Sequence, residues 1–301
     1  MNLVHCVMHI PDRYRILDRL GKQSVRKFGN VYLVEDKEQR TQCVLKAARK
    51  SAESNVVYQR LVHESTFNFN DSGLPRTLDQ LDSGTEYLLI RNYLPGIPLD
   101  DYWQTLTKKD RLPFLLALLS ALHRLFEKLN AEQVVHCDIK PGNVLVHQSE
   151  TGIGVSLIDF GLALKQNDPD QRNILFPLGY AAPELLLNAL DLVDHRSDIY
   201  ALGVTIWRLF SGKLPLTHPN PGIFTNLQLT HPIPDHGSLP RGMHPILLKM
   251  CHKHSFRVPP NRMAKAEVRN VLKTAMNNRY ASLEEVRIDL KKIATKKRRW
   301  F

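Results

Sequence analysis

Short apolar and β-branched runs, separated by polar breaks, make up most of the first ninety residues. Five such runs stand at 13–20, 30–36, 42–47, 77–82 and 86–93. Runs of this length, bounded by polar and turn residues, predict β-strands. Between the third and the fourth run, residues 51–69 space their apolar side chains as one face of a helix does, so a single helix is expected there.

The pattern changes after residue 94, where Pro95, Gly96 and Pro98 interrupt regular structure. Beyond them, helices are predicted at 112–130, 197–210, from Pro245 onward and at 283–293, and short strands at 144–148 and 154–160. The proline-rich stretch 218–241 is expected to be mostly loop. Strands first and helices afterwards are typical of an α+β fold. We therefore expect a small lobe at 1–94 with an antiparallel sheet and one helix, a larger, mainly helical lobe at 95–290, and a basic tail at 291–301.

The composition is that of an ordinary soluble globular protein, with 301 residues, 43% of them hydrophobic and 24% charged. Four scattered cysteines without a CxxC pair do not form a disulfide framework, which favours a reducing compartment. The start of the chain lacks the features of a signal peptide. The most apolar window, 114–126, is too short to span a bilayer. The expected location is the cytoplasm.

The formal net charge is +11, and part of this excess is concentrated at the end of the chain. The basic residues of the tail are Lys291, Lys292, Lys296, Lys297, Arg298 and Arg299. A basic surface favours an anionic partner, such as an acidic protein, nucleic acid or anionic lipid. Trp300 and Phe301 would suit a membrane interface. A solvated end of the last helix is the simpler interpretation, because charge runs are usually solvated.

Two polar segments carry the candidate chemistry. The first is HCDIKPGN at 136–143, and the second is Asp159-Phe160-Gly161 at the exit of a predicted strand pair. Acidic or amide groups at the edge of a strand pair can hold a divalent cation through oxygen ligands, and magnesium bridges such ligands to phosphate oxygens. A further carboxylate can orient a hydroxyl nucleophile, and a nearby lysine can neutralise charge on a phosphoryl group.

These segments belong to a set of five that resembles the protein kinase family along nearly the whole chain. The set consists of VLKAA at 44–48, HCDIKPGN at 136–143, IDFG at 158–161, GYAAPE at 179–184 and SDIYALG at 197–203. Each motif alone is a weak or moderate signal, but five in this order are highly specific. The resemblance implies a bilobal kinase fold and transfer of the γ-phosphate of ATP, with Mg²⁺, to serine or threonine hydroxyls of protein substrates.

The resemblance also implies a role for each matched residue. Asp138 is expected to orient the substrate hydroxyl, and Lys140 to stabilise the γ-phosphate. Asn143 and Asp159 are expected to bind magnesium. Lys46 is expected to hold the α- and β-phosphates. Because Lys140 follows the catalytic aspartate by two residues, as in the serine/threonine branch, a serine/threonine acceptor is favoured over tyrosine.

Lys46 needs a carboxylate from the small-lobe helix, and both Glu53 and Glu64 are candidates. The spacing of the family favours Glu64. The residues that the resemblance places around the nucleotide are Ser24, Gly29, Val31, Val44, Lys46, Asn92, Leu94 and Leu145. In the large lobe, Arg279 is expected to pair with Glu184, and Asp198 to accept backbone hydrogen bonds from the catalytic loop.

The chain departs from the family in three places. The phosphate loop aligns with residues 24–29 and keeps only the last of its three glycines, Gly29. Arg91 falls where the family has an apolar residue beside the adenine pocket, and it is expected to face a carboxylate or solvent because an unpaired buried charge is costly. Cys137 replaces an arginine that grips a loop phosphate, and residues 161–179 contain no serine, threonine or tyrosine. We therefore expect a segment that is set without loop phosphorylation, by packing or by a partner.

Three functions are compatible with these residues. The leading one is an active protein kinase, because all the groups that do chemistry are present. The second is a kinase-like scaffold, favoured by the glycine-poor loop and by Arg91. The third is a small-molecule kinase, which the substrate platform formed by Glu184, Asp198 and Arg279 disfavours. The apparent lack of a sensor domain favours regulation by a protein activator.

Overall fold

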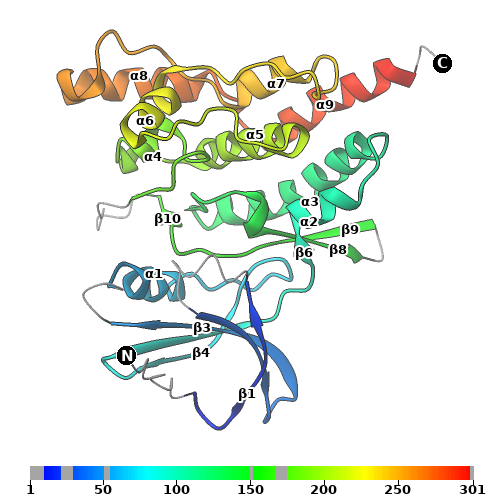
Figure 1. The fold of residues 1–301 in the computed structure, drawn as a ribbon, viewed down its shortest axis with the longest axis vertical. Coiled ribbons are helices and arrows are strands. Elements are labelled where there is room, and N and C mark those ends of the chain that lie inside the picture. The colour runs from blue at the N-terminus through cyan, green and yellow to red at the C-terminus, as the bar shows by residue number, and fades with distance from the viewer. Residues whose placement is uncertain (1–9, 22–29, 51–54, 150–151, 167–174, 299–301) are drawn as a thin grey trace. The chain divides into compact units, whose positions relative to one another are not determined.

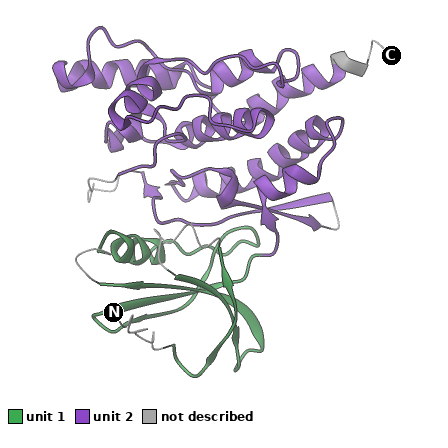
Figure 2. Cartoon of the chain, in the orientation of Figure 1, with its two compact units in different colours: residues 1–94 green, residues 95–301 purple. Residues whose placement is uncertain are grey.

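The computed structural model describes residues 10–21, 30–50, 55–149, 152–166 and 175–298, with side chains up to residue 295. The chain divides into two compact units, residues 1–94 and residues 95–301 (Figure 2). The first unit is an antiparallel sheet with one helix, and the second is mainly helical (Figure 1).

Five antiparallel strands form the sheet of the first unit. They are β1 (Tyr14–Leu20), β2 (Asn30–Asp36), β3 (Thr41–Arg49), β4 (Thr77–Asp82) and β5 (Glu86–Asn92). Their order across the sheet is β1-β2-β3-β5-β4. Each lies within two residues of a run that the sequence predicts as a strand.

The sheet has apolar packing on both faces. On one face, Leu45 and Ile90 belong to a buried cluster that includes Tyr14 of β1. On the other face, Ala48 and Leu89 pack against helix α1 (Asn55–Ser65). Residues in a strand alternate between faces, and β5 is covered on both, so its side chains are buried almost without alternation.

Helix α1 is shorter than the sequence predicts. Residues 51–54 lie outside the described part of the chain, and the helix ends at Ser65 rather than at residue 69. Phe67 and Phe69 are buried in the segment that follows, so their apolar character reflects the core and not a continuing helical face. The carbonyl of Phe67 accepts a hydrogen bond from the side chain of Arg91.

The second unit contains helices and short strands. Its α-helices are α2 (Leu99–Thr105), α3 (Arg111–Ala131), α4 (Pro183–Leu186), α5 (His195–Ser211), α6 (Pro221–Thr230), α7 (Met243–Met250), α8 (Lys265–Asn277) and α9 (Leu283–Arg298). Its strands are β6 (Ile97–Pro98), β7 (Val134–Val135), β8 (Val144–Ser149), β9 (Gly152–Leu157) and β10 (Leu164–Lys165), paired as β6-β8-β9 and β10-β7. Within the described part of the chain, no helix is both long and apolar enough to cross a membrane.

Helix α5 forms the core of the second unit and is buried along nearly all of its length. It begins where the side chain of Asp194 accepts a hydrogen bond from the backbone N–H of Arg196, and it ends at Gly212, whose φ is 80°. A Cβ added at Gly203 would lie 2.6 Å from Sγ of Cys251, so this glycine permits the close approach of the residues that follow α7.

Helix α6 corrects the expectation of a loop over 218–241. Pro221 occupies the start of the helix, where its missing N–H costs nothing. Asn220 caps that end, and its side-chain oxygen accepts hydrogen bonds from the backbone N–H groups of Gly222 and Ile223. The prolines therefore border a helix, because proline is tolerated in the first turn and not in the interior.

A buried ion pair joins α4 to the segment before α9. Glu184 accepts hydrogen bonds from Nη1 and Nη2 of Arg279, at 2.6 and 3.0 Å, and both side chains are fully buried. Ser197 of α5 donates a further hydrogen bond to the same carboxylate. The predicted pairing of Arg279 with Glu184 is confirmed. Two opposite charges with several hydrogen bonds can remain buried, whereas either one alone cannot.

We predict that Arg279→Met lowers the free energy of unfolding by about 3–5 kcal/mol, because it leaves the carboxylate of Glu184 buried and unpaired. Chemical denaturation measures the change. The matched control is Arg269→Met, which breaks a pair with Asp191 whose side chains are 42% and 37% exposed. The control should cost much less, because an exposed ion pair contributes little to stability. Equal losses in the two variants would contradict the prediction.

Candidate active site

In the first unit, the candidate site is built on β3 and α1. Nζ of Lys46 donates hydrogen bonds to both carboxylate oxygens of Glu64, at 2.7 and 2.9 Å. Tyr58, Leu61 and Glu64 follow each other at three-residue spacing and form the buried face of α1, which places the carboxylate against the sheet. Of the two carboxylates considered for Lys46, Glu64 is its partner here, and Glu53 lies outside the described residues.

Two of the residues expected to contact the nucleotide share a face of the sheet with Lys46. Val31 of β2 lies directly opposite Lys46 across the β2–β3 ladder. Val44 is two residues before Lys46 on β3, so its side chain points to the same side. The structure therefore brings Val31, Val44 and Lys46 together. Ser24 and Gly29, which the sequence places in a phosphate loop, lie outside the described residues.

Arg91 is buried, at 2% exposure, and faces a carboxylate, which is one of the two placements expected for it. Its hydrogen bonds go to backbone carbonyls, which the sequence did not predict. A carboxylate oxygen of Glu64 lies 4.0 Å from its Nη2. An arginine can be buried in this way because carbonyl oxygens replace its hydration. Sequence alone did not reveal these partners, since they belong to the end of α1 and to the loop that follows it.

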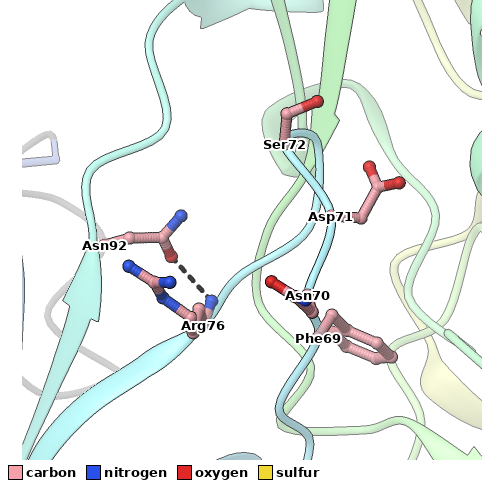
Figure 3. A pocket seen from close by; sticks show the side chains of 6 residues that line it. All are labelled: Phe69, Asn70, Asp71, Ser72, Arg76 and Asn92. Atoms are coloured by element: carbon pink, nitrogen blue, oxygen red, sulfur yellow. Dashed lines mark hydrogen bonds between the residues drawn. The ribbon is translucent and has the colours of Figure 1, made fainter.

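A small polar pocket of about 260 Å³ lies beside Asn92 (Figure 3). The residues that line it are Phe69, Asn70, Asp71, Ser72, Arg76 and Asn92. The side-chain oxygen of Asn92 accepts a hydrogen bond from the backbone N–H of Arg76, at 2.6 Å (Figure 3). The backbone N–H of Asn92 donates to the carbonyl of Arg76. Of the residues predicted to contact the nucleotide, the pocket includes Asn92, while Leu94 is buried at the end of the unit.

In the second unit, a buried carboxylate holds the catalytic loop. Asp198 of α5 accepts hydrogen bonds from the backbone N–H groups of His136 and Cys137, both at 2.8 Å, as predicted. Cys137 has a positive φ of 62°, which is unusual for a residue other than glycine. The two hydrogen bonds keep this conformation in place. Burial raises the pKa of Asp198, while these bonds and the neighbouring His136 lower it.

Asp138 occupies the centre of this loop. Its Oδ2 accepts hydrogen bonds from Nζ of Lys140, at 2.6 Å, and from Nδ2 of Asn143, at 2.9 Å. Its Oδ1 is buried and has no hydrogen-bond partner among the described residues. Burial raises the pKa of Asp138, and the charge of Lys140 opposes this shift. The carboxylate therefore has one oxygen engaged and one oxygen available.

Asp159 follows β9 and lies close enough to Asp138 for its charge to raise the pKa of that residue. The backbone N–H of Ile158 donates to the carbonyl of Asn143, which joins the two segments. Asp159 has a positive φ of 68°, a strained conformation of the kind that persists at functional sites. The structure thus brings Asn143 and Asp159 together in the second unit. Leu145 lies two residues beyond Asn143 on β8.

A divalent cation fits this pair of residues. Asn143 directs its amide nitrogen toward Asp138, which leaves the amide oxygen as a hard ligand. Asp159 supplies a carboxylate. Among the described residues there is no group of three or more His, Cys, Asp or Glu side chains that could hold a metal. A site with few protein ligands suits magnesium, which takes its remaining ligands from water and phosphate.

His136 is a residue of this site to which the sequence analysis assigned no role. Its Nε2 lies 3.1 Å from the carbonyl of Ile158, and its ring packs against Phe160 with the ring centroids 4.5 Å apart. Burial lowers the pKa of its imidazole. His136 thus connects the loop of Asp138 to the segment of Asp159. Its position at the start of the HCDIKPGN motif was the available signal.

Comparison with known proteins agrees with this geometry. Residues 14–284 match the protein kinase domain family. The chain is 28% identical to the serine/threonine-protein kinase pkn2 of Myxococcus xanthus over 224 residues, which are 70% of this chain and 26% of pkn2. It is 25% identical to the serine/threonine-protein kinase PrkC of Bacillus subtilis over 260 residues, which are 82% of this chain and 38% of PrkC. The match covers well under half the length of either relative.

The predicted fold class is confirmed, since an antiparallel sheet unit with one helix is followed by a mainly helical unit, and the family match spans both. Within each unit, a residue from the motifs that carried the resemblance contacts another candidate site residue. Lys46 contacts Glu64 in the first unit, and Asp138 contacts Asn143 in the second. The match extends over most of the chain, and the chain therefore belongs to the protein kinase family.

Proposed function

We propose that this chain is a phosphotransferase that moves the γ-phosphoryl group of Mg-ATP to serine or threonine hydroxyls of protein substrates. The observation that carries the proposal is the environment of Asp138. One carboxylate oxygen is held by Lys140 and Asn143, and the other is buried without a partner. A buried oxygen without a hydrogen bond costs free energy, and a substrate hydroxyl would donate the missing hydrogen bond.

In this reaction, Asp138 orients the hydroxyl and accepts its proton. The bond from the substrate oxygen to the γ-phosphorus forms while the bond from that phosphorus to the oxygen of ADP breaks. The ammonium group of Lys140, held on Asp138, offsets negative charge on the phosphoryl group in transfer. Because phosphoryl transfer depends mainly on positioning and charge, these groups are sufficient to carry it.

Asn143 and Asp159 would hold the magnesium ion, which neutralises charge on the phosphate oxygens when it is bound. Lys46 binds the α- and β-phosphates, and Glu64 keeps its ammonium group in position. Val31 and Val44, which share the face of Lys46, offer apolar contacts to the nucleotide. These roles follow the correspondence between this chain and the kinase motifs.

The acceptor is a serine or threonine of a protein. The relatives pkn2 and PrkC are serine/threonine-protein kinases, and Lys140 has the position typical of that branch. The buried pair of Glu184 and Arg279 supports the end of the segment that would receive a protein substrate.

A kinase-like scaffold is the alternative, and the glycine-poor sequence of residues 24–29 favours it. Arg91 is the second feature that favours it, although Nη1 and Nη2 of its guanidinium donate to carbonyls of its own unit. Nucleotide binding separates the two functions, since a ligand that binds only the native state raises the melting temperature.

We predict that Asp138→Asn lowers kcat by about 10²–10⁴-fold, because the amide cannot accept the hydroxyl proton. Lys46→Met should lower kcat/KM for ATP by about 10²–10³-fold through loss of charge stabilisation. The measurement is phosphate transfer from Mg-ATP to a basic protein acceptor, with modified residues identified by mass spectrometry. Asp191→Asn, at an exposed ion pair, is the control and should leave transfer unchanged.

Transfer that survives in both variants would contradict the proposal. Neither nucleotide binding nor transfer would point to the scaffold, whereas binding without transfer would point to a missing activator or protein substrate. Transfer to sugars or aminoglycosides and not to proteins would point to a small-molecule kinase. Modified tyrosine in place of serine or threonine would overturn the acceptor assignment.

We predict that phosphatase treatment leaves the specific activity unchanged. Residues 161–179 contain no serine, threonine or tyrosine, and Cys137 cannot bind a phosphate as the arginine of the family does. The assay compares treated and untreated protein, with intact-mass measurement to verify dephosphorylation. A loss of activity that preincubation with Mg-ATP restores would show that phosphorylation activates the chain after all.

A further inference from the structure

Arg91 lies on the face of the sheet that carries Lys46. It stands directly opposite Val44 across the β3–β5 ladder, and Leu89, two residues before it, stands opposite Lys46. Residues two apart on a strand point to the same side, so Arg91 and Leu89 both face α1. Leu89 packs in the apolar cluster with Tyr58 and Leu61 of that helix. A charged residue here needs a specific reason to be buried.

The reason is that the C-terminal end of α1 lies next to the guanidinium group of Arg91. Nη1 of Arg91 donates to the carbonyls of Phe67, at 2.6 Å, and of Pro75, at 3.3 Å, and Nη2 donates to the carbonyl of Glu64. The last carbonyls of a helix have no intrahelical partner, and a cation near them is favoured by the helix dipole. Arg91 therefore caps α1 from a neighbouring strand and joins it to the loop that follows.

One residue connects this cap to Lys46. The backbone carbonyl of Glu64 accepts from Arg91, and the side-chain carboxylate of the same residue accepts from Lys46. The guanidinium also lies 4.0 Å from that carboxylate, close enough for direct attraction. The carboxylate thus stands between two cations, and its backbone is held by one of them. The fork of an arginine suits this arrangement, because it donates from two separate nitrogens, whereas a lysine would donate from a single one.

We propose that Arg91 is a positioning residue, which fixes the end of α1 so that the carboxylate of Glu64 stays on Lys46. The carbonyls that Arg91 contacts and the carboxylate that contacts Lys46 belong to residues 64–75, and none of these contacts involves a phosphate on the segment 161–179. This explains how a chain without hydroxyls in that segment keeps its lysine–glutamate pair. The effect on catalysis rests on the proposed function, whereas the effect on α1 does not.

Other contacts keep α1 on the sheet when Arg91 is changed. The hydroxyl of Tyr58 donates to Asp82, and that of Tyr87 donates to Ser65. The apolar cluster around Leu61 is also independent of Arg91. A variant of comparable length, Arg91→Met, is therefore expected to fold, with a change confined to the end of the helix. Arg91→Lys retains the charge and loses the fork.

The first readout is hydrogen exchange, followed by mass spectrometry, on the full chain without nucleotide. In Arg91→Met, exchange of the peptide covering residues 61–67 should rise about tenfold to a hundredfold, as expected for loss of hydrogen bonds to a charged group. Strands β3 and β5 should keep their protection. Arg91→Lys should show an intermediate rise. Arg15→Met, which removes a 61% exposed arginine of β1, is the control and should change nothing in that peptide.

The second readout is the split between kcat and KM. Arg91→Met should lower kcat by up to about a hundredfold through misplacement of Lys46, with the KM for the protein acceptor unchanged. Arg91→Lys should restore part of kcat. If Arg91 only supported the fold, the loss of activity in Arg91→Met would match the loss of folded protein inferred from its melting temperature. The kcat of Arg91→Lys would then rise only in proportion to its folded fraction.

Two results would overturn the inference. One is unchanged exchange of residues 61–67 in a folded Arg91→Met variant. The other is faster hydrogen exchange of the same peptide than of β3 and β5 in the unaltered chain. This second result can be obtained even if the variant does not fold. If the unaltered chain transfers no phosphate, the proposed function fails, while the exchange experiment still tests the role of Arg91 at α1.

Discussion

The hydrogen bonds of Asp198 to the catalytic loop are the constraint on which the second unit depends. A buried carboxylate on α5 accepts two backbone N–H groups and so holds Cys137 at a positive φ. With that bend in place, Asp138 reaches both Lys140 and Asn143. Because α5 is buried along nearly its whole length, the carboxylate is attached to a closely packed element of the unit.

The first unit follows the same principle with the charges reversed. Here a buried cation, Arg91, holds the backbone at the end of α1, and the carboxylate of Glu64 then positions Lys46. In both units a buried charged side chain forms hydrogen bonds with backbone atoms. These bonds fix the position of a second charged side chain, which is Asp138 in the second unit and Glu64 in the first. Burial makes such contacts rigid, since an unpaired charge in the interior costs several kcal/mol.

The departures of this chain from the kinase family fit together in physical terms. Cys137 is buried where the family has an arginine, and the segment 161–179 offers no hydroxyl for a phosphate. Arg91, in contrast, is an added cation in the first unit. The chain has therefore lost a cation that would read a loop phosphate and has gained one that acts inside the sheet unit.

The strands of the first unit and the helices α1, α3, α5, α7 and α9 could be predicted from the sequence, whereas the short strands β6, β7 and β10 and the helices α2, α4 and α6 were not. Apolar periodicity is a local property, so β2 and α5 appear within two residues of their predicted bounds. The candidate site residues could also be recognised, because each belongs to a short motif and the order of these motifs resembles that of the kinase family. Proline content was misleading for α6, since the same residue that stops a helix can begin one.

Only the tertiary structure decided which groups share a buried environment. The end of α1 depends on Arg91, which is 26 residues beyond Ser65, and the bend at Cys137 depends on Asp198, which is 61 residues away. Contacts over such separations leave no periodic signal, because they join residues whose local patterns are independent. The sequence by itself therefore determined the elements and the candidate chemistry, and the packing of those elements determined how each charge is held.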